Sequence, residues 1–352
     1  MSDLAERFRR LIRAHGPIPV NRFMGESNAL YYSSRDPLGA PKEEGGGDFV
    51  TAPDISQMFG EIIGLWLTDL WSRAGRPSDA VYVELGPGRG TLAADALRVM
   101  RAQGFAPQVH FVEGSPVLRK SQAEAVPGAL FHDELSTLPD GVPLLVVANE
   151  FLDALPIRQL VRAESGWRER LIALEGESLA FVAGLQPMDL AIPPVFASAP
   201  PGTILETCPG AAAAVEEVAR RLAQHGGAAL FIDYGHLQPR TGSTLQAVRA
   251  HRKIDPLSAP GEADLTAHVD FTQLAQCARA AGAQWLSATS QGQWLRSLGI
   301  EQRAAALASR EPDRAGALAA DLARLVQPED MGDLFKVAAF GAGGWPPAAG
   351  FA

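Results

Sequence analysis

The segment VYVELGPGRGTLAADAL, residues 81–97, joins a short apolar run to a helical pattern through a glycine-rich turn. Glycines in such a turn let the backbone bend tightly and approach a ligand closely. The apolar runs at 109–114 and 143–149 each lie next to a further helical or polar segment. Short strands that alternate with helices predict an α/β fold, with a parallel sheet covered by helices on both faces.

The segment 158–184 interrupts this alternation. Turn residues at 164–166 and 175–177 separate runs with strand character, so we expect two hairpins that form an antiparallel insertion. A helix over 208–227 and a buried strand over 228–236 then resume the alternation. We expect residues 286–328 to be mostly helical, residues 332–341 to form the last strand, and the tail after it to be loose.

Five parts follow from this division of the chain. We expect an N-terminal helical segment with a lid loop (1–80), a cofactor-binding Rossmann-like core (81–157), the antiparallel hairpin insertion (158–205), the rest of the core with a helical insertion (206–340) and a tail (341–352).

Composition excludes several classes of protein. The chain has 352 residues, of which 47% are hydrophobic and 20% charged, and such a chain can bury a sizeable core. A net charge of -9 disfavours a nucleic-acid-binding surface. Cys208 and Cys277 do not form a CxxC pair, and no His, Asp or Glu cluster has convincing metal spacing, so we expect no metal site. No apolar run has the length of a membrane span, and residues 1–16 resemble a docked helix more than a signal peptide.

An acidic residue beside the glycine turn distinguishes between two cofactors. A dinucleotide site favours the spacing GxGxxG, whereas Gly86, Gly88 and Gly90 have the spacing GxGxG. Glu84 precedes them at the end of the predicted strand, where a carboxylate would repel a pyrophosphate. It would suit a ligand with an ammonium group, and S-adenosylmethionine carries an ammonium and a sulfonium.

Further acidic residues follow the next predicted strands. Glu113 ends the second strand, where a carboxylate can accept hydrogen bonds from both ribose hydroxyls, although NAD sites use an acid in the same place. Asp133 follows the third strand, where it could lie beside the adenine amine. Together these residues favour a class I methyltransferase over a dehydrogenase, although a glycine-rich turn alone is often only a tight connection. The predicted cofactor residues in this core are Glu84, Gly86, Gly88, Gly90, Thr91, Glu113, Gly114, Asp133, Glu134 and Asn149.

The fourth predicted strand ends in ANEFLDALP, which suggests the methyl acceptor site. Glu150 and Asp153 would form an acidic pocket there, and we predict both as catalytic residues. Carboxylates can hold a guanidinium group through paired hydrogen bonds and polarise it toward one nitrogen. Asp153 could equally begin a helical turn that ends at Pro156.

Two segments outside this strand contain further candidates. The glycine-rich segment 45–53 could fold over the cofactor as a lid, with Asp48, Phe49 and Thr51 as contacts, or it could be an ordinary surface loop. We expect Asp233, His236 and His268 to lie at the rim of the pocket and contact substrate. A lone histidine such as His268 more often has a structural role.

Several long motifs in this order resemble one known family. They are GDFVTAPDISQMFGE (47–61), VELGPGRGTL (83–92), NEFLDALP (149–156), FIDYGH (231–236) and DLTAHVDFTQL (264–274). They are similar to the MidA-like methyltransferases over roughly residues 20–340. The resemblance implies a class I, Rossmann-like, seven-stranded fold and S-adenosyl-L-methionine as cofactor. It also implies a protein partner, because the mitochondrial members are complex I assembly factors that methylate an arginine of a complex I subunit.

Three other functions remain open on sequence. A non-catalytic assembly factor could use the same fold to hold a partner, and a small-molecule methyltransferase would share the cofactor loop. A nucleic-acid enzyme should show a basic, aromatic-lined face.

We expect this protein to lie in the bacterial cytoplasm, whereas its eukaryotic relatives are expected in the mitochondrial matrix. The sequence does not determine the oligomeric state, and the helix around Trp66 and Trp71 and the hairpin insertion are candidate contact surfaces.

Overall fold

The computed structural model describes residues 3–34 and 50–351, which form parts of two compact units. The sheet unit consists of Val50–Leu152, Ala212–Leu237 and Asp270–Ala352. The accessory unit consists of Met1–Phe49, Asp153–Ala211 and Gln238–Val269. Because both units are assembled from three separate segments, each one is described by itself.

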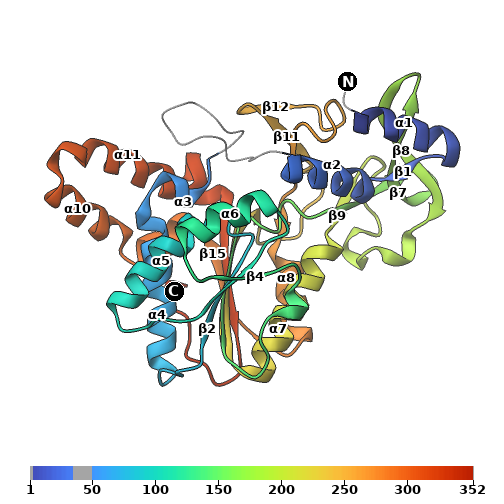
Figure 1. The fold of residues 1–352 in the computed structure, drawn as a ribbon. Coiled ribbons are helices and arrows are strands. Elements are labelled where there is room, and N and C mark those ends of the chain that lie inside the picture. Colours follow the sequence, from blue (N-terminus) through green and yellow to red (C-terminus); the bar gives the residue numbers. More distant parts are fainter. Residues whose placement is uncertain (1–2, 35–49, 352) are drawn as a thin grey trace. The chain divides into compact units, whose positions relative to one another are not determined.

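A mixed seven-stranded path forms the centre of the sheet unit (Figure 1). Its order is β15-β16-β10-β5-β2-β3-β4. The five strands from β10 to β4 are parallel, and β16 is antiparallel to both of its neighbours. This architecture confirms the predicted class I methyltransferase fold.

The elements of this unit begin and end as follows. The strands are β2 (Val81–Leu85), β3 (Val109–Val112), β4 (Leu130–His132), β5 (Leu144–Asn149), β10 (Gly227–His236), β15 (Gln284–Ser290) and β16 (Phe335–Gly341). The helices are α3 (Ala52–Ile55), α4 (Gln57–Arg73), α5 (Thr91–Ala102), α6 (Pro116–Ala125), α7 (Pro209–His225, with its first residues in the accessory unit), α8 (Phe271–Ala280), α9 (Gln291–Ser297), α10 (Ile300–Arg310) and α11 (Ala315–Val326).

Continuous apolar runs form the central strands because both faces of this sheet are buried. All five residues of β2 and all six of β5 are buried. Alternate side chains such as Tyr82, Leu145 and Val147 pack into one cluster with α4 and α5. Helices α7 and α8 lie on the opposite side of the sheet (Figure 1). The pattern of short apolar runs therefore correctly predicted a sheet between two helical layers.

The expectation of helix from residue 286 onward was wrong at its start. Residues 284–290 form β15, which pairs antiparallel with β16, and the three helices α9, α10 and α11 follow. Its sequence, QWLSATS, has no residue that is fully buried, and it pairs with β16 at the end of the sheet. An edge strand of this kind lacks a strong apolar alternation, so its pairing partner determines its conformation.

The expectation of a loose tail was also wrong. The indole nitrogen of Trp66 donates to the carbonyl of Ala349 at 3.1 Å, and the Phe351 ring lies 6.3 Å from that of Trp294. Trp66 and Trp71 are themselves buried, so they form part of the core and do not provide the exposed contact surface that the sequence suggested.

The accessory unit contains two antiparallel sheets. The first has the order β1-β7-β6-β9, with β8 also paired to β7, and the second has the order β12-β11-β13. The strands β6, β7 and β8 confirm the two predicted hairpins. The elements are α1 (Asp3–His15), β1 (Ile18–Pro19), α2 (Val20–Ser34), β6 (Arg158–Ala163), β7 (Gly166–Glu175), β8 (Ser178–Pro187), β9 (Ile204–Thr207), β11 (Gln246–Arg249), β12 (Arg252–Ile254) and β13 (Asp264–Thr266); β14 (Val269–Asp270) spans the boundary between the units.

Helix α1 confirms the docked helix that was predicted within residues 1–16. Its buried residues Leu4, Phe8 and Ile12 join the larger apolar core of the accessory unit. Among residues 3–34 and 50–351, no helix combines the length and apolarity needed to span a membrane.

Gly227 offers a test of how closely β10 approaches β5. Its φ is +116°, and a Cβ at this position would lie 2.0 Å from the carbonyl oxygen of Leu144. We expect Gly227→Ala to lower the free energy of unfolding by at least about 3 kcal/mol, because positive-φ strain and a backbone clash add. Urea unfolding measures this loss.

Gly104→Ala is the matched control. Gly104 also has a positive φ, +83°, but nothing lies within 4 Å of the place that a Cβ would take. We expect it to cost about 1 kcal/mol, the strain alone. Equal losses in the two variants would contradict the close approach of the strands.

Candidate cofactor and substrate site

The glycine turn follows β2 and leads directly into α5. Gly86, Gly88 and Gly90 have φ values of +61°, +55° and +82°, which other residues adopt only with strain. A Cβ on Gly86 would lie 2.9 Å from the Phe151 ring. The positive φ angles therefore favour glycine at all three positions, and at position 86 the Phe151 ring also leaves no room for a side chain. Thr91 is the first residue of α5.

The predicted site residues of the sheet unit lie along one edge of the sheet. Strands β2, β3, β4 and β5 are parallel, so their carboxyl ends, followed by Gly86, Glu113, Asp133 and Glu150, point the same way. The chain extends the sheet from β2 through β3 to β4, then returns to β5 on the other side of β2. Ligands of open α/β sheets bind at this reversal of strand order.

Glu84 is a buried carboxylate at the end of β2. Its side chain accepts a hydrogen bond of 2.5 Å from the hydroxyl of Tyr82, two residues earlier on the same strand. Burial raises the pKa of Glu84 to about 8, against the opposite effect of the Tyr82 hydrogen bond. A cationic ligand would stabilise the ionised form of this carboxylate.

Glu113 is held by several hydrogen bonds. One carboxylate oxygen accepts from the backbone N–H of Ser115 at 2.7 Å, and the other from the Gln122 amide at 3.0 Å. The same Gln122 nitrogen donates to the carbonyl of Gly88 at 2.7 Å. Burial raises the pKa of Glu113, and these hydrogen bonds act in the opposite direction. The glycine turn and the predicted ribose acid are thus joined by one side chain.

Asp133 and Glu134 differ from the other acids because they are exposed. Asp133 is 83% exposed and forms an ion pair of 2.6 Å with Arg119, whose guanidinium also donates to the carbonyl of Glu113. Glu134 accepts from the Ser136 hydroxyl at 3.1 Å. Gly114 is exposed and its Cβ position is open. The role of these residues beside adenine stays a prediction.

Glu150 adopts a strained backbone conformation immediately after β5. Its φ is +52°, rare for a residue with a side chain, and strain of this kind concentrates at functional sites. One carboxylate oxygen, Oε1, accepts from the Ala52 N–H at 3.3 Å and from the Asn149 amide at 3.1 Å. Burial, and secondarily the nearby Asp233, raise the pKa of Glu150 to about 8.

Asp233 holds the segment that carries Glu150. Its two carboxylate oxygens accept from the backbone N–H groups of Leu152 and Tyr234, at 2.8 Å and 2.9 Å. The side chain is 1% exposed. The structure thus supports a positioning function for Asp233, whereas the sequence suggested a substrate contact.

The remaining predicted residues have the following positions and partners. His236 in the sheet unit approaches Asp270 at 3.9 Å. In the accessory unit, Asp153 is 5% exposed and contributes, after burial and Asp264, to raising the pKa of Tyr32, and His268 lies 3.4 Å from Arg240. Thr51 donates its hydroxyl proton to Asp54 at 2.8 Å. Asp48 and Phe49, with most of the predicted lid, lie outside the described residues.

Comparison with known proteins decides the family. Residues 62–289 match a family described as "Putative S-adenosyl-L-methionine-dependent methyltransferase". The chain belongs to this methyltransferase family.

Two kinds of relative support this assignment. A crystal structure from Burkholderia thailandensis, bound to S-adenosyl-homocysteine, is 30% identical with a TM-score of 0.86, over 98% of this chain and 93% of that one. The mitochondrial protein arginine methyltransferase NDUFAF7 of Danio rerio is 37% identical, over 92% of this chain and 83% of its own. The human protein of the same name is 34% identical, over 92% and 80%.

The methyltransferase uses S-adenosyl-L-methionine, and the described residues fit this cofactor. The glycine turn carries no side chains at positions 86, 88 and 90 that could hinder the close approach of a ligand to its backbone. Glu84 offers a buried carboxyl group to a cation. The Asn149 side-chain oxygen is buried and has no hydrogen-bond partner among the described residues. A buried oxygen of this kind is suited to accept a hydrogen bond from a ligand.

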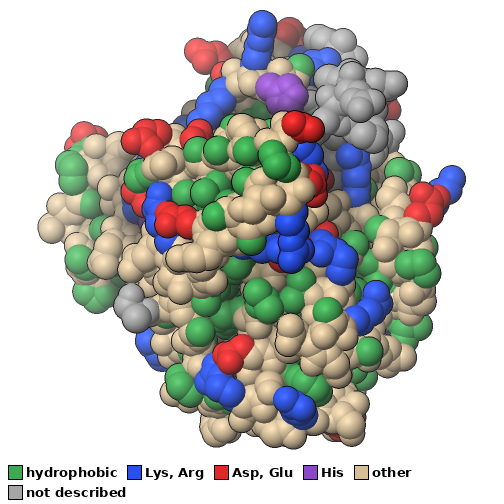
Figure 2. All heavy atoms as spheres, turned by 90° about the vertical axis from the view of Figure 1, so that its left-hand side faces the viewer, with side chains coloured by type: hydrophobic (Ala, Val, Ile, Leu, Met, Phe, Trp, Pro, Cys, Tyr) green, Lys and Arg blue, Asp and Glu red, His purple; other side chains and the backbone are tan. Residues whose placement is uncertain are grey.

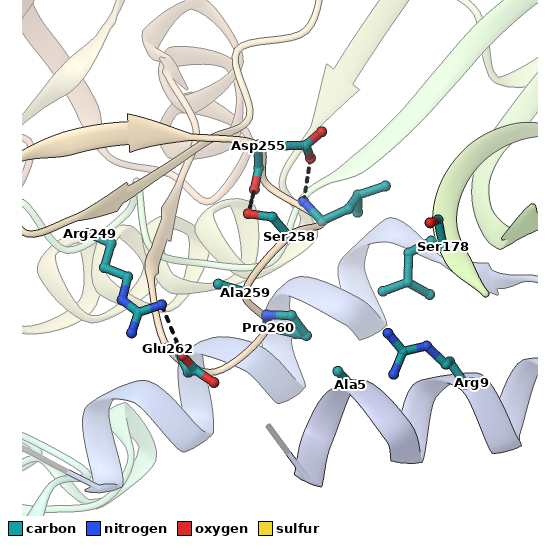
Figure 3. A pocket seen from close by; sticks show the side chains of 11 residues that line it. Ala5, Arg9, Ser178, Arg249, Asp255, Ser258, Ala259, Pro260 and Glu262 are labelled. Carbon is teal, nitrogen blue, oxygen red and sulfur yellow. Dashed lines mark hydrogen bonds and ion pairs between the residues drawn. The ribbon is translucent and has the colours of Figure 1, made fainter. Parts of the chain in front are cut away.

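A separate hollow of the methyltransferase lies entirely within the accessory unit (Figure 3). It has a volume of about 420 Å³. Arg249 pairs with Glu262 at 3.0 Å, the Ser258 hydroxyl donates to the carbonyl of Asp255 at 2.7 Å, and Arg9 donates to the carbonyl of Glu177 at 2.8 Å. These polar groups already have partners within the protein.

Among the residues that the structure describes, no group of three His, Cys, Asp or Glu could hold a metal ion.

Sequence reasoning missed three features of the site. Tyr82, Gln122 and the positioning function of Asp233 become visible only through their hydrogen bonds. Tyr82 stands two positions before Glu84, and this spacing on a strand could have indicated a shared face. Gln122 lies on a helix and carried no comparable signal.

Proposed function

We propose that this methyltransferase transfers a methyl group to an arginine of a protein, and that Glu150 binds the guanidinium. The observation that carries the proposal is the strained, hydrogen-bonded Glu150 carboxylate at the sheet edge that also bears the glycine turn. The relatives named protein arginine methyltransferases support the same substrate class.

In this proposal the sheet unit holds the cofactor in three places. Glu84 accepts from its ammonium group, Glu113 from its ribose hydroxyls, and the glycine turn allows its close approach. The bound cofactor supplies an electrophilic methyl group on a sulfonium. The exposed predictions Asp133 and Glu134 would lie on the adenine side.

Glu150 has one oxygen available for the acceptor. Oε1 is occupied by Ala52 and Asn149, whereas no described residue donates to Oε2. We propose that Oε2 accepts an N–H of the guanidinium, fixes its orientation and takes up the proton that the attacking nitrogen releases. Alignment of this kind accounts for much of the rate in a direct displacement. Asp153 remains proposed as its helper.

The proposal extends to partner and location. We propose, from the MidA-like resemblance, that the protein substrate is a respiratory complex I subunit and that the enzyme acts in the bacterial cytoplasm. On the face shown in Figure 2, basic side chains are interspersed with acidic and apolar ones. That distribution and the net charge of -9 favour a protein over a nucleic acid as substrate.

The test combines binding and transfer. Calorimetric titration with S-adenosylmethionine, S-adenosylhomocysteine and NAD should give saturable binding of the first two alone. Incubation with labelled cofactor and arrays of arginine-containing peptides should then yield methylarginine by mass spectrometry, and arrays with lysine in place of arginine should stay unlabelled. Cofactor binding without any labelled peptide or protein extract would favour a partner-holding scaffold. Labelling of small molecules alone would favour the small-molecule alternative.

A further inference from the structure

We infer that Gln122 is a positioning residue for cofactor binding, which sets the glycine turn and Glu113 at a fixed separation. This inference rests on the proposed cofactor roles of those two groups. Gln122 is not one of the residues that we propose to contact the cofactor.

The first support is the pair of hydrogen bonds from one nitrogen atom. Gln122 Nε2 donates to the carbonyl of Gly88 at 2.7 Å and to Glu113 Oε2 at 3.0 Å. Both acceptors belong to segments that follow strands of the sheet, whereas Gln122 lies on α6. A single amide on a helix therefore joins the ends of two neighbouring strands.

The second support is that only one orientation of the amide is compatible with these neighbours. Rotating the amide by half a turn would bring Oε1 toward the Gly88 carbonyl and the Glu113 carboxylate, both of which are acceptors. A glutamate at this position would place a second negative charge there. The site thus requires a neutral donor of glutamine length.

The third support is the packing of α6 against the turn. Gln122 is fully buried, and a Cβ on Gly90 would lie 3.2 Å from Ala125 and 3.5 Å from the Gln122 backbone. The helix and the turn are therefore in direct contact, and the amide cannot move away without disturbing it. A preorganised site loses less free energy when it binds its ligand.

The experiment compares Gln122→Met and Gln122→Glu with the wild-type enzyme. Methionine keeps the length and removes both hydrogen bonds, and we expect it to weaken S-adenosylhomocysteine binding by about tenfold, as for the loss of hydrogen bonds to a charged group. Calorimetry measures this dissociation constant. In steady-state assays we expect KM for the cofactor to rise while kcat stays within about threefold.

The Gln122→Glu variant adds a readout that depends on pH. The charged residues on these elements are Glu113 after β3, Arg89 in the glycine turn, and Arg119, Lys120 and Glu124 on α6. At about pH 8 the introduced carboxylate would be ionised and would repel Glu113, so we expect binding about 100-fold weaker than in the wild type. At about pH 5.5 the introduced carboxyl is protonated and can donate, so the deficit relative to wild type at the same pH should shrink to about tenfold or less.

Gln291 provides matched controls. It is also fully buried, its amide donates to the carbonyl of Leu325 at 2.9 Å, and its Oε1, like that of Gln122, has no partner among the described residues. Gln291→Met and Gln291→Glu should change thermal stability but leave the dissociation constant within about twofold of wild type.

The outcomes separate this inference from the proposed cofactor site. Wild-type affinity in both Gln122 variants, or equal losses in the Gln291 variants, would overturn the positioning role. Glu113→Gln tests the cofactor site itself: wild-type affinity in that variant would reject the ribose role of Glu113, whatever the Gln122 variants do. If a Gln122 variant fails to fold while its Gln291 counterpart folds, the role is structural and the inference is rejected.

Discussion

Exchange of Glu150 for glutamine is expected to lower kcat by about 1,000-fold while the dissociation constant for S-adenosylhomocysteine stays within about threefold. The amide keeps the size of the side chain and can still contact the Ala52 N–H, but it cannot hold a guanidinium by charge or accept its proton. Peptide methylation followed by mass spectrometry measures the first quantity, and calorimetry the second.

The pKa of Glu150 adds a signature to this prediction. Burial raises this pKa to about 8, so the free enzyme carries the ionised form only in part at neutral pH. The wild-type kcat/KM for the peptide should therefore rise with pH up to about 8, and the residual activity of Glu150→Gln should lack that rise. Asp54→Asn is the control, because the effect of Asp54 on the Glu150 pKa ranks after those of burial, Asp233 and the two hydrogen bonds. Loss of cofactor binding together with transfer would mean that Glu150 belongs to the cofactor site.

Glu84→Gln should weaken S-adenosylhomocysteine binding by about 100-fold near pH 8.5, since loss of one partner of a buried charge pair typically costs about 2–5 kcal/mol. The wild-type affinity itself should depend on pH. The pKa of Glu84 is about 8 without ligand, and a bound ammonium favours the ionised form, so binding releases a proton. Affinity should rise about twentyfold from about pH 6.5 to about pH 8.5, and glutamine should abolish most of this rise.

Stability provides an independent readout for Glu84. Because the folded protein binds this proton more tightly than the unfolded chain, the Glu84 contribution to stability decreases as pH rises from the ordinary carboxyl pKa toward about 8. Glu84→Gln should therefore raise the unfolding temperature near that upper pH while it weakens binding. Tyr82→Phe keeps the carboxylate and should retain the pH dependence of binding. An unchanged pH dependence in Glu84→Gln would contradict the role of this acid.

The parts of the fold that could be predicted from sequence are those in which local pattern and burial agree. Residues 81–85 and 144–149 are largely apolar and are buried on both faces of the sheet, so their sequence pattern predicts buried central strands. The glycine turn was predictable because the positive φ angles at Gly86, Gly88 and Gly90 select glycine. Strand β15 was not, since its half-buried residues obtain their conformation from pairing with β16.

The candidate site also contains some residues that could be predicted from the sequence and others that could not. Residues at strand ends, such as Glu84, Glu113 and Glu150, could be located because parallel strands bring their carboxyl ends to one edge. The hydrogen bonds of Gln122 and Asp233 join segments far apart in sequence, and no local pattern records such a pairing. The exposed ion pair of Asp133 with Arg119 likewise depends on the fold.

Strand β16 lies between β10 and β15, so these two strands are joined in one sheet only after residues 335–341 have paired with both of them. During translation, residues up to 341 must leave the ribosome before this sheet can be completed, because nascent segments fold only as they emerge. All segments of the accessory unit have been synthesised once translation has passed Val269. A nascent chain stalled before residue 335 should therefore expose the edge of β10 and leave residues 284–290 without their pairing partner, and a chaperone would need to shield both.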